Sequence, residues 1–377
     1  MNKVYRNLED LCQVLDSKRI PITANKRTPG PYPYYGANGV QDYINEYIFD
    51  DDLVLLAEDG GNFGSTDKPI AYRVSGKCWV NNHAHVLKPN NEINVDYLCY
   101  SLMFYNTGSL VNGATRKKLT QATMRTMRIP WVPIVEQIEI VDKLKKTAAI
   151  IDKKELILRR LDQLIKSRFI ELFGDPVSND KFWNLAILQD VTSKIGSGAT
   201  PKGGKSSYQK EGIPFIRSMN VHDGVFLSKD LAYLSDKQAK QLENVIVKEN
   251  DVLLNITGAS VARSCIVPKT VIPARVNQHV SIIRCIPKYL NPEFLNKLFL
   301  HHRYKNLLLS LGEAGGATRQ AITKSQLEKL QIILPPLTLQ NEFADFVQQV
   351  DKSKLAVQKS LEKLEILKKS LMQQYFG

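Results

Sequence analysis

The most prominent chemical pattern in the sequence is a glycine-rich basic loop, Ala199-Thr-Pro-Lys-Gly-Gly204-Lys205-Ser206. It fits a relaxed phosphate-binding loop with alanine in the first glycine position. A working loop of that kind follows a buried strand and opens a helix, so that backbone N–H groups and the helix dipole hold the phosphate. Here a polar run precedes the loop, and Gly212-Ile-Pro214 soon follows and disfavours a long helix. A flexible basic loop is therefore favoured, and an NTPase using Ala199–Ser206 stays as the alternative.

Other patterns that could support catalysis are weaker. Asn291-Pro-Glu-Phe294 only partly matches the Asn/Asp-Pro-Pro-aromatic motif of methyltransferases and is typical of a helix start. The run Asp50–Asp52 is more typical of a solvated turn than of a metal-binding nuclease site. His83 and His85 alternate as strand neighbours would, without a nearby cysteine or acid at ligand spacing. We therefore predict no catalytic residue, no metal site and no cofactor of the chain's own.

Charge and cysteine content indicate the partner and the compartment. Lysine and arginine exceed the acids by 51 − 38 = 13, which favours an acidic partner, most commonly nucleic acid, with a membrane surface as the rival. No apolar run approaches the roughly 20 residues of a spanning helix, and the first ten residues, MNKVYRNLED, lack a signal-peptide core. The five cysteines are far apart and contain no CxxC pair, as expected in a reducing cytosol. We predict a cytoplasmic DNA-binding protein.

Side chains that could read base edges or hold phosphates gather in two stretches. Each one taken singly is more often a solvated or structural polar residue. The candidates of the first stretch are Tyr34, Tyr35, Asn38, Asn62, Asn82, His83, Arg116 and Lys117. Those of the second are Lys202, Lys205, Ser207, Arg217, Asn220, Thr257, Arg263, Arg275 and Asn277. Arg116 and Arg319 both end a Gly-Ala-Thr-Arg sequence, which either shapes a loop or contacts phosphate.

A long internal repeat organises the chain around these candidates. Gly113–Gly174 and Gly316–Gly377 are both 62 residues long and are related by one offset, 316 − 113 = 203. The offset carries Arg116 to Arg319, and it also carries Gln137 to Gln340. A repeat of this length predicts an architecture built twice.

Each copy of the repeat contains a predicted long helix with apolar residues every seven positions, the seam of a coiled coil. At 1.5 Å per residue each helix would span roughly 50 Å. Either each helix packs on its own globular domain, or the two helices pair with each other, and the second interpretation is favoured. The seam residues match at an offset of 199, one helical turn from the 203 that fits the ends. They are Leu144, Ile151, Leu158, Ile165 and Leu172 in the first helix, and Phe343, Val350, Val357, Leu364 and Leu371 in the second.

The stretches that precede the two repeats show a mixed pattern of β-rich runs and helix starts, and they resemble each other faintly. Asp52-Leu-Val-Leu-Leu matches Asp251-Val-Leu-Leu at an offset of 199, and Val80–His83 matches Val276–His279 at 196. We predict a mixed α/β (α+β) protein in the order domain, helix, domain, helix. The predicted boundaries are 1–133, 134–174, 175–336 and 337–377.

These features together resemble the DNA-specificity subunit of type I restriction-modification systems. The resemblance rests on IPWVPIVEQ at Ile129–Gln137, LPPLTLQ at Leu334–Gln340, the KSRFIELFG and KSLMQQYFG ends, GIPFIRSMNV, ENDVLLNITGASVAR and YYGANG. The family usually has an acid before the repeated glutamine. Glu136 fits this pattern, whereas Leu339 departs from it.

The resemblance implies two target-recognition domains separated by two long conserved helices that form an antiparallel coiled coil, with pseudo-twofold symmetry. Each domain would read one half of a bipartite DNA site, while the helices set the spacer and dock two modification subunits. S-adenosylmethionine would belong to those methyltransferase subunits, and ATP and magnesium to restriction subunits where these are present. The chain itself would be non-catalytic. Besides the NTPase, the alternative is a coiled-coil scaffold with non-specific DNA binding.

Overall fold

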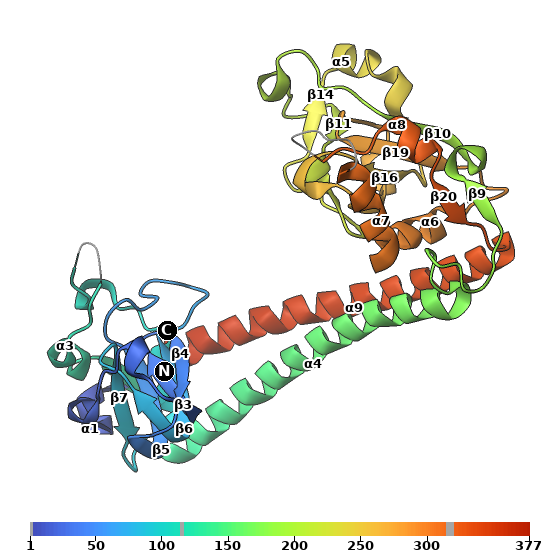
Figure 1. Ribbon diagram of the computed structural model, residues 1–377. Coiled ribbons are helices and arrows are strands. Elements are labelled where there is room, and N and C mark those ends of the chain that lie inside the picture. Colours follow the sequence, from blue (N-terminus) through green and yellow to red (C-terminus); the bar gives the residue numbers. More distant parts are fainter. Residues whose placement is uncertain (1–2, 114–116, 314–319) are drawn as a thin grey trace. The chain divides into compact units, whose positions relative to one another are not determined.

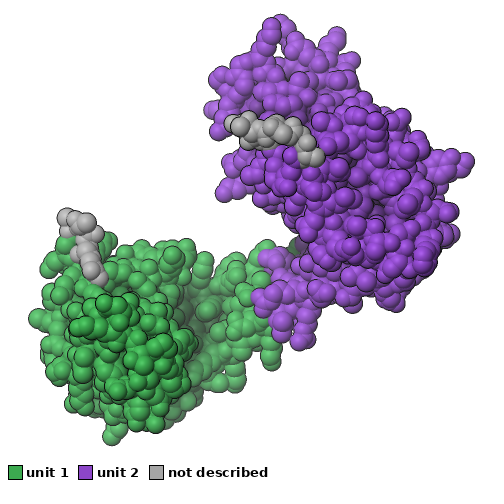
Figure 2. Space-filling view, viewed as in Figure 1, with its two compact units in different colours: residues 1–155, 359–377 green, residues 156–358 purple. Residues whose placement is uncertain are grey.

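The computed structural model describes residues 3–113, 117–313 and 320–377. The chain forms two compact units, coloured separately in Figure 2. Unit 1 contains Met1–Glu155 and Lys359–Gly377, and unit 2 contains Leu156–Gln358. Each unit therefore includes part of both long helices, α4 (Ile134–Phe173) and α9 (Leu337–Phe376).

Unit 1 is built on a six-stranded mixed sheet (Figure 1). All neighbouring strands are antiparallel apart from β3 and β6, which run parallel. The sheet order is β2 (Cys12–Val14), β7 (Ala84–Pro89), β5 (Phe49–Ala57), β6 (Ala71–Val80), β3 (Pro29–Gly36) and β4 (Gly39–Ile44). The remaining elements are β1 (Val4–Asn7) paired with β8 (Arg128–Trp131), and the helices α1 (Leu8–Leu11), α2 (Val95–Met103) and α3 (Gln121–Arg125).

Unit 2 divides the same plan between two four-stranded sheets. The first is β10 (Thr192–Ser197), β19 (Val280–Cys285), β16 (Val252–Asn255) and β17 (Ser264–Ile266). The second is β14 (Ala232–Leu234), β11 (Ile213–Ile216), β18 (Ala274–Val276) and β15 (Ile246–Val247), with β11 and β18 parallel. The other elements are the pairs β12 (Val221–His222) with β13 (Val225–Phe226) and β9 (Leu185–Ile187) with β20 (Gln331–Ile333), and the helices α5 (Asp236–Lys240), α6 (Pro292–Leu300), α7 (His302–Glu313) and α8 (Lys324–Glu328).

The strand pairings correct one alignment made from the sequence. Val54 pairs with Leu87 on β7, and Val252 pairs with Ile283 on β19, so Val54 corresponds to Val252 at an offset of 252 − 54 = 198. The expected offset of 199 is wrong by one residue. Because successive strand residues face opposite sides of a sheet, that shift would place every side chain on the wrong face. The match between Val80–His83 and Val276–His279 agrees with the pairing, since β3 lies parallel beside Val80 and β11 beside Val276.

The repeated glutamine has the same structural role in both units. Gln137 and Gln340 are fully buried near the starts of α4 and α9. Gln137 Oε1 accepts from the backbone N–H of Asn94 at 2.8 Å, and Gln340 Oε1 accepts from Asn291 N–H at 2.9 Å. Asn94 and Asn291 in turn cap α2 and α6 with their side chains. Each glutamine Nε2 donates to two backbone carbonyls, those of Glu92 and Val132 in unit 1 and those of Tyr289 and Pro335 in unit 2.

The long helices pack both on the domain cores and on each other. In unit 1, Leu144 of α4 and Tyr375 of α9 lie in one apolar cluster. In unit 2, the ring centroids of Phe169 and Phe343 are 5.6 Å apart, and Lys354 Nζ lies 2.6 Å from Asp162 Oδ1. The end of one helix thus meets the start of the other, as in an antiparallel pair. Both interpretations from the sequence hold, because the helix ends join the cores while the helices contact each other.

The predicted seam lies on the packed side of both helices. Five of its residues are buried, namely Leu144, Ile151, Ile165, Phe343 and Val350. The other five, Leu158, Leu172, Val357, Leu364 and Leu371, are half-buried. Among the described residues, no helix is long and apolar enough to cross a membrane.

Candidate nucleic-acid interface

Several predicted DNA-contacting residues of unit 1 meet on neighbouring loops at one end of the sheet. Asn38 Nδ2 donates to the carbonyl of Gly60 at 3.0 Å, and Gly60 N–H donates to the carbonyl of Lys117 at 3.3 Å. His83 Nδ1 lies 2.7 Å from Asp59 Oδ1. Asn82, on the turn between β6 and β7, is exposed. These loops, together with Asn62 just beyond Gly60, form what we call the loop end of unit 1.

Unit 2 builds its own loop end in the same way. Gly258 N–H donates to the carbonyl of Gln320 at 2.9 Å, which is the counterpart of the Gly60–Lys117 bond because 117 + 203 = 320. Thr257 Oγ1 contacts His279 Nδ1, as Asp59 contacts His83. The carbonyl of Arg263 accepts from Asn255 N–H at 2.9 Å, and Arg217 follows Ile216, whose carbonyl accepts from Asn277 N–H at 3.0 Å. The loop bearing Lys202, Lys205 and Ser207 starts at the same end, because Gly198 N–H donates to the carbonyl of Asn277 at 3.1 Å.

The exposure of the predicted residues separates them into groups. Asn38, Asn82, Lys117, Lys202 and Lys205 are exposed. Tyr35, Asn62, His83, Ser207, Arg217, Thr257 and Arg263 are half-buried. Arg116 and Arg319 lie outside the described residues. The first two groups are the ones that can offer a side chain to DNA without rearrangement.

Four predicted contacts are buried, and the structure corrects them. Tyr34 is 1 % exposed and its hydroxyl is bonded to the backbone of Ile22. Asn220 is fully buried and its amide donates to the carbonyls of Leu227 and Lys229. Arg275 donates to the carbonyls of Ala239 and Ala274, and Asn277 accepts from His279 N–H. Buried polar groups need such partners, so these four side chains shape the units from inside.

The structure does not favour the phosphate-loop alternative. The basic loop ends in a short 3₁₀ turn, Gly204–Ser207, and β11 begins at Ile213. A turn of four residues lacks the aligned N–H groups and the dipole of a helix N-terminus. The loop therefore presents Lys202 and Lys205 as exposed charges without a built phosphate cradle.

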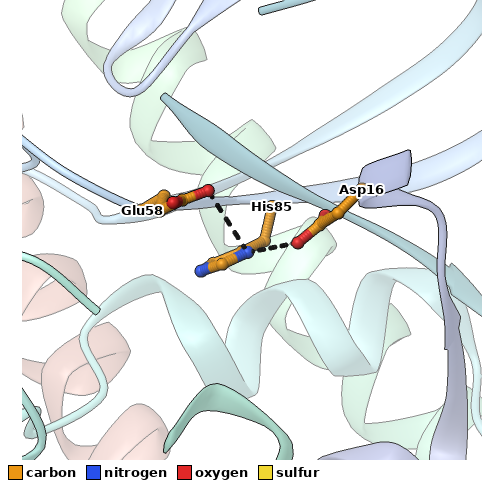
Figure 3. Close-up of side chains that lie close together, drawn as sticks. All are labelled: Asp16, Glu58 and His85. Carbon is orange, nitrogen blue, oxygen red and sulfur yellow. Dashed lines mark hydrogen bonds and ion pairs between the residues drawn. The ribbon is translucent and has the colours of Figure 1, made fainter. Parts of the chain in front are cut away.

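Sequence reasoning missed a cluster of charged residues beneath the loop end of unit 1. His85 is fully buried, and its Nδ1 lies 2.6 Å from Asp16 Oδ2 and 3.7 Å from Glu58 Oε2 (Figure 3). Its Nε2 lies 2.9 Å from the carbonyl of Leu119. Arg19 lies 2.6 Å from Glu58 and 3.5 Å from Asp16, and Lys118 lies 3.1 Å from Glu58. We call Asp16, Arg19, Glu58, His85 and Lys118 the ion network.

The ion network is held by hydrogen bonds and by opposite charges. Both ring nitrogens of His85 face acceptors, the Asp16 carboxylate and the Leu119 carbonyl. Burial alone would raise the pKa of Asp16, but the hydrogen bond and charge of His85, the N–H of Val86 and the charge of Arg19 together lower it. Asp16 is 69 residues from His85 in sequence, which is why no local pattern could reveal the pair.

Asp16, Glu58 and His85 also have the donor types of a metal site. Their geometry does not favour one. Arg19 and Lys118 already supply positive charge to the two carboxylates and would repel a cation there. The bond from His85 to the Leu119 carbonyl does not decide the matter, because a metal-bound histidine also donates its other ring N–H to such a carbonyl. The positive neighbours make an ionic cluster the better fit.

Comparison with known proteins identifies the family. The family model described as the type I restriction modification DNA specificity domain matches residues 2–163 and 181–367, nearly the whole chain. The protein belongs to this family. It is a type I restriction-modification specificity subunit with two specificity domains.

Relatives and solved structures agree with this assignment. A Haemophilus influenzae protein named as a type I restriction enzyme specificity subunit is 26 % identical over 354 residues, covering 91 % of this chain and 86 % of the relative. The EcoBI specificity subunit of Escherichia coli is 22 % identical, covering 72 % and 61 %. The crystal structure of a type I S subunit from M. genitalium has a TM-score of 0.63 at 12 % identity, covering 100 % and 96 %, which shows the shared fold. The coiled coil of paired long helices is consistent with that fold.

Proposed function

We propose that each loop end of this specificity subunit reads one half of a bipartite DNA site, and that the long helices set the gap between the halves. The observation that carries the proposal is the duplicated loop end. The bonds Gly60–Lys117 and Gly258–Gln320 occupy equivalent places, and each lies among exposed polar or basic side chains. Two equivalent reading surfaces on one chain suit a split recognition sequence.

Methylated-adenine mapping tests this proposal in cells that carry the subunit with its modification partners. We expect a split motif with a constant gap that disappears when the gene is deleted. A methylome unchanged by deletion would contradict the proposal. DNA affinity that falls with salt and is equal for all sequences would instead support a non-specific scaffold.

Arg263 is expected to contribute to one half-site only. Its side chain is half-buried at the loop end of unit 2, and within the described ranges it has no hydrogen bond or ion pair from the side chain. Arg263→Ala should weaken discrimination at one half-site by about 1–3 kcal/mol, or roughly 5- to 150-fold. Competition binding with DNAs altered in each half separately measures the effect. The control Lys269→Ala removes an exposed cation that pairs with Glu249 instead. Equal weakening of both half-sites by Arg263→Ala would mean phosphate contact without sequence reading.

The long helices also offer surfaces for the modification subunits. In unit 2 exposed apolar side chains remain on both helices, with Ile157 42 %, Leu164 47 % and Leu355 57 % exposed. Ile157 and Leu164 are seven residues apart and share one face of α4. In unit 1 the exposed set includes Ile150 and Ile366. Apolar groups left in water on a charged helix are typical of a protein interface, so we propose that two modification subunits dock there, one on each unit.

Ile157→Glu is expected to weaken assembly with the modification subunit without unfolding the chain. A charge on the exposed stripe would have to be buried without a partner when the complex forms. The predicted loss of affinity is about tenfold or more, measured by titration with the isolated modification subunit. Gln163→Glu introduces the same side chain at an exposed position on another face of α4 and should leave affinity unchanged. Unchanged affinity of the Ile157→Glu variant for the modification subunit would show that the docking surface lies elsewhere.

The proposal assigns chemistry to the partners. The chain would be non-catalytic, S-adenosylmethionine would bind to the modification subunits, and ATP and magnesium would bind to restriction subunits where these are present. The complex would act in the cytoplasm on chromosomal DNA.

All five cysteines are free and buried, and burial raises the pKa of Cys265 to about 12, so these thiols are poor nucleophiles.

A further inference from the structure

The ion network joins three of the segments that form the loop end of unit 1, those that bear Gly60, Asn82 and Lys117. Asp16 follows β2, and it accepts from Val86 N–H at 2.8 Å and from Gln121 Nε2 at 3.0 Å. Glu58 follows β5, directly before Asp59 and Gly60. His85 is the second residue of β7, and its bond to the Leu119 carbonyl holds the segment that follows Lys117 and Lys118.

Arg19 links the network to the turn that carries the candidate contacts. Its guanidinium donates to the carbonyls of Ala84 at 2.8 Å and Asn82 at 3.5 Å, while also contacting Glu58. Asn82 and His83 therefore lie on a turn whose backbone carbonyls are hydrogen-bonded to the charged guanidinium of Arg19. Lys118 reaches the same carboxylate from the next segment, beside the exposed Lys117.

Unit 2 holds its equivalent loops without these charges. Leu56 pairs with His85 on the strands of unit 1, and Leu254 pairs with Ser281 in unit 2, so Ser281 takes the place of His85. Glu58 N–H donates to His83, as Ile256 N–H donates to His279, so Ile256 takes the place of Glu58. Ile256 lies in the apolar core of unit 2 together with Ile322, the counterpart of Leu119. The network is therefore not needed to build this fold.

We propose that the ion network is a positioning device for sequence reading by unit 1, setting half-site specificity without contacting DNA. The inference rests on the proposed function of the two loop ends. Packed apolar side chains hold loops through contacts that have no preferred direction. Hydrogen-bonded charges fix directions as well as distances and are costly to break when buried. The loops that bear Asn82 and Lys117 are thereby held in one arrangement relative to each other, and Asn38 bonds to the Gly60 carbonyl beside them.

Methylation by the assembled complex of specificity and modification subunits provides the test. DNAs with single-base changes in either half-site are compared, and Arg263→Ala first identifies the half read by unit 2. Glu58→Gln keeps the shape of the side chain and removes its charge, and His85→Ser introduces the residue found in unit 2. Both variants should lose about tenfold in discrimination at the half-site read by unit 1. Discrimination at the half-site read by unit 2 should remain unchanged.

The matched control is an ion pair at the opposite end of the same strands. Lys88 on β7 lies 2.6 Å from Asp51 on β5, and Asp51→Asn should leave both half-sites unchanged. Circular dichroism melting ensures that every variant is assayed while folded. Unchanged discrimination in Glu58→Gln, or equal loss at both half-sites, would overturn the proposal. So would zinc or manganese that raised the melting temperature of the wild type but not of His85→Ser, because the cluster would then be a metal site.

A wild-type complex that showed no bipartite specificity would instead refute the proposed function. The two failures are therefore distinguishable within one set of assays. The positioning role also predicts that Glu58→Gln changes discrimination more than overall DNA affinity, a split that general destabilisation would not produce.

Discussion

Removing one heptad from each long helix is expected to shorten the recognised gap by about three base pairs. Seven helical residues span about 10.5 Å, and base pairs are spaced about 3.4 Å apart along DNA. The deletions are residues 152–158 in α4 and 355–361 in α9, which lie opposite each other by the pairing of Asp162 with Lys354 and of Arg168 with Glu342. A whole heptad keeps the seam on the same face. Methylation of the original site should fall by orders of magnitude, and methylated-adenine mapping would show the same half-sites closer together.

A length-preserving variant serves as the control for that deletion. Replacing residues 152–158 with a second copy of residues 159–165 alters the sequence of α4 while the helix keeps 40 residues and apolar side chains at positions 157 and 158. It should retain the original gap if assembly is intact. A deletion variant that remained folded and still methylated the original site would show that the helices do not determine the gap.

Gln340→Leu is expected to destabilise unit 2 by about 3 kcal/mol or more. Leucine fills a similar volume but leaves the N–H of Asn291 and the carbonyls of Tyr289 and Pro335 without their partner, at about 1–3 kcal/mol for each buried group that stays unpaired. Gln137→Leu should do the same to unit 1. For a unit of this size the melting temperature should fall by about 10 °C.

Hydrogen exchange distinguishes the two glutamine variants, because each should raise exchange in its own unit. Gln348→Leu on the exposed surface of α9 is the control and should change the melting temperature little. Faster hydrogen exchange confined to α9 and absent from α6 would contradict this prediction, because Gln340 bonds the backbone of the residue that caps α6.

Much of the loop end could be located from the sequence but not resolved into contacts. Asn38, Asn82, Lys117 and Lys205 are exposed on loops, as polar turn residues usually are. The side chains of Tyr34 and Arg275 are of types equally suited to DNA contact, but they are buried. Their partners, the backbone of Ile22 and of Ala239, come from other segments, and residue type alone does not report such packing.

The sequence by itself determined the long helices, the duplicated order of domain and helix, and the basic character of the chain. These features depend on local periodicity and composition, which involve only residues close together in the sequence. The match of the two glutamines also identified a repeated structural position before its bonds were known.

Only the tertiary structure decided the strand register, the burial of four predicted contacts, and the meeting of Asp16, Glu58 and His85. Each depends on segments tens of residues apart that are brought together by the sheet. A one-residue change in register reverses the faces of a strand without changing its local pattern. The charged cluster beneath one loop end and the apolar packing beneath the other therefore follow from topology, although the repeat makes the two units alike.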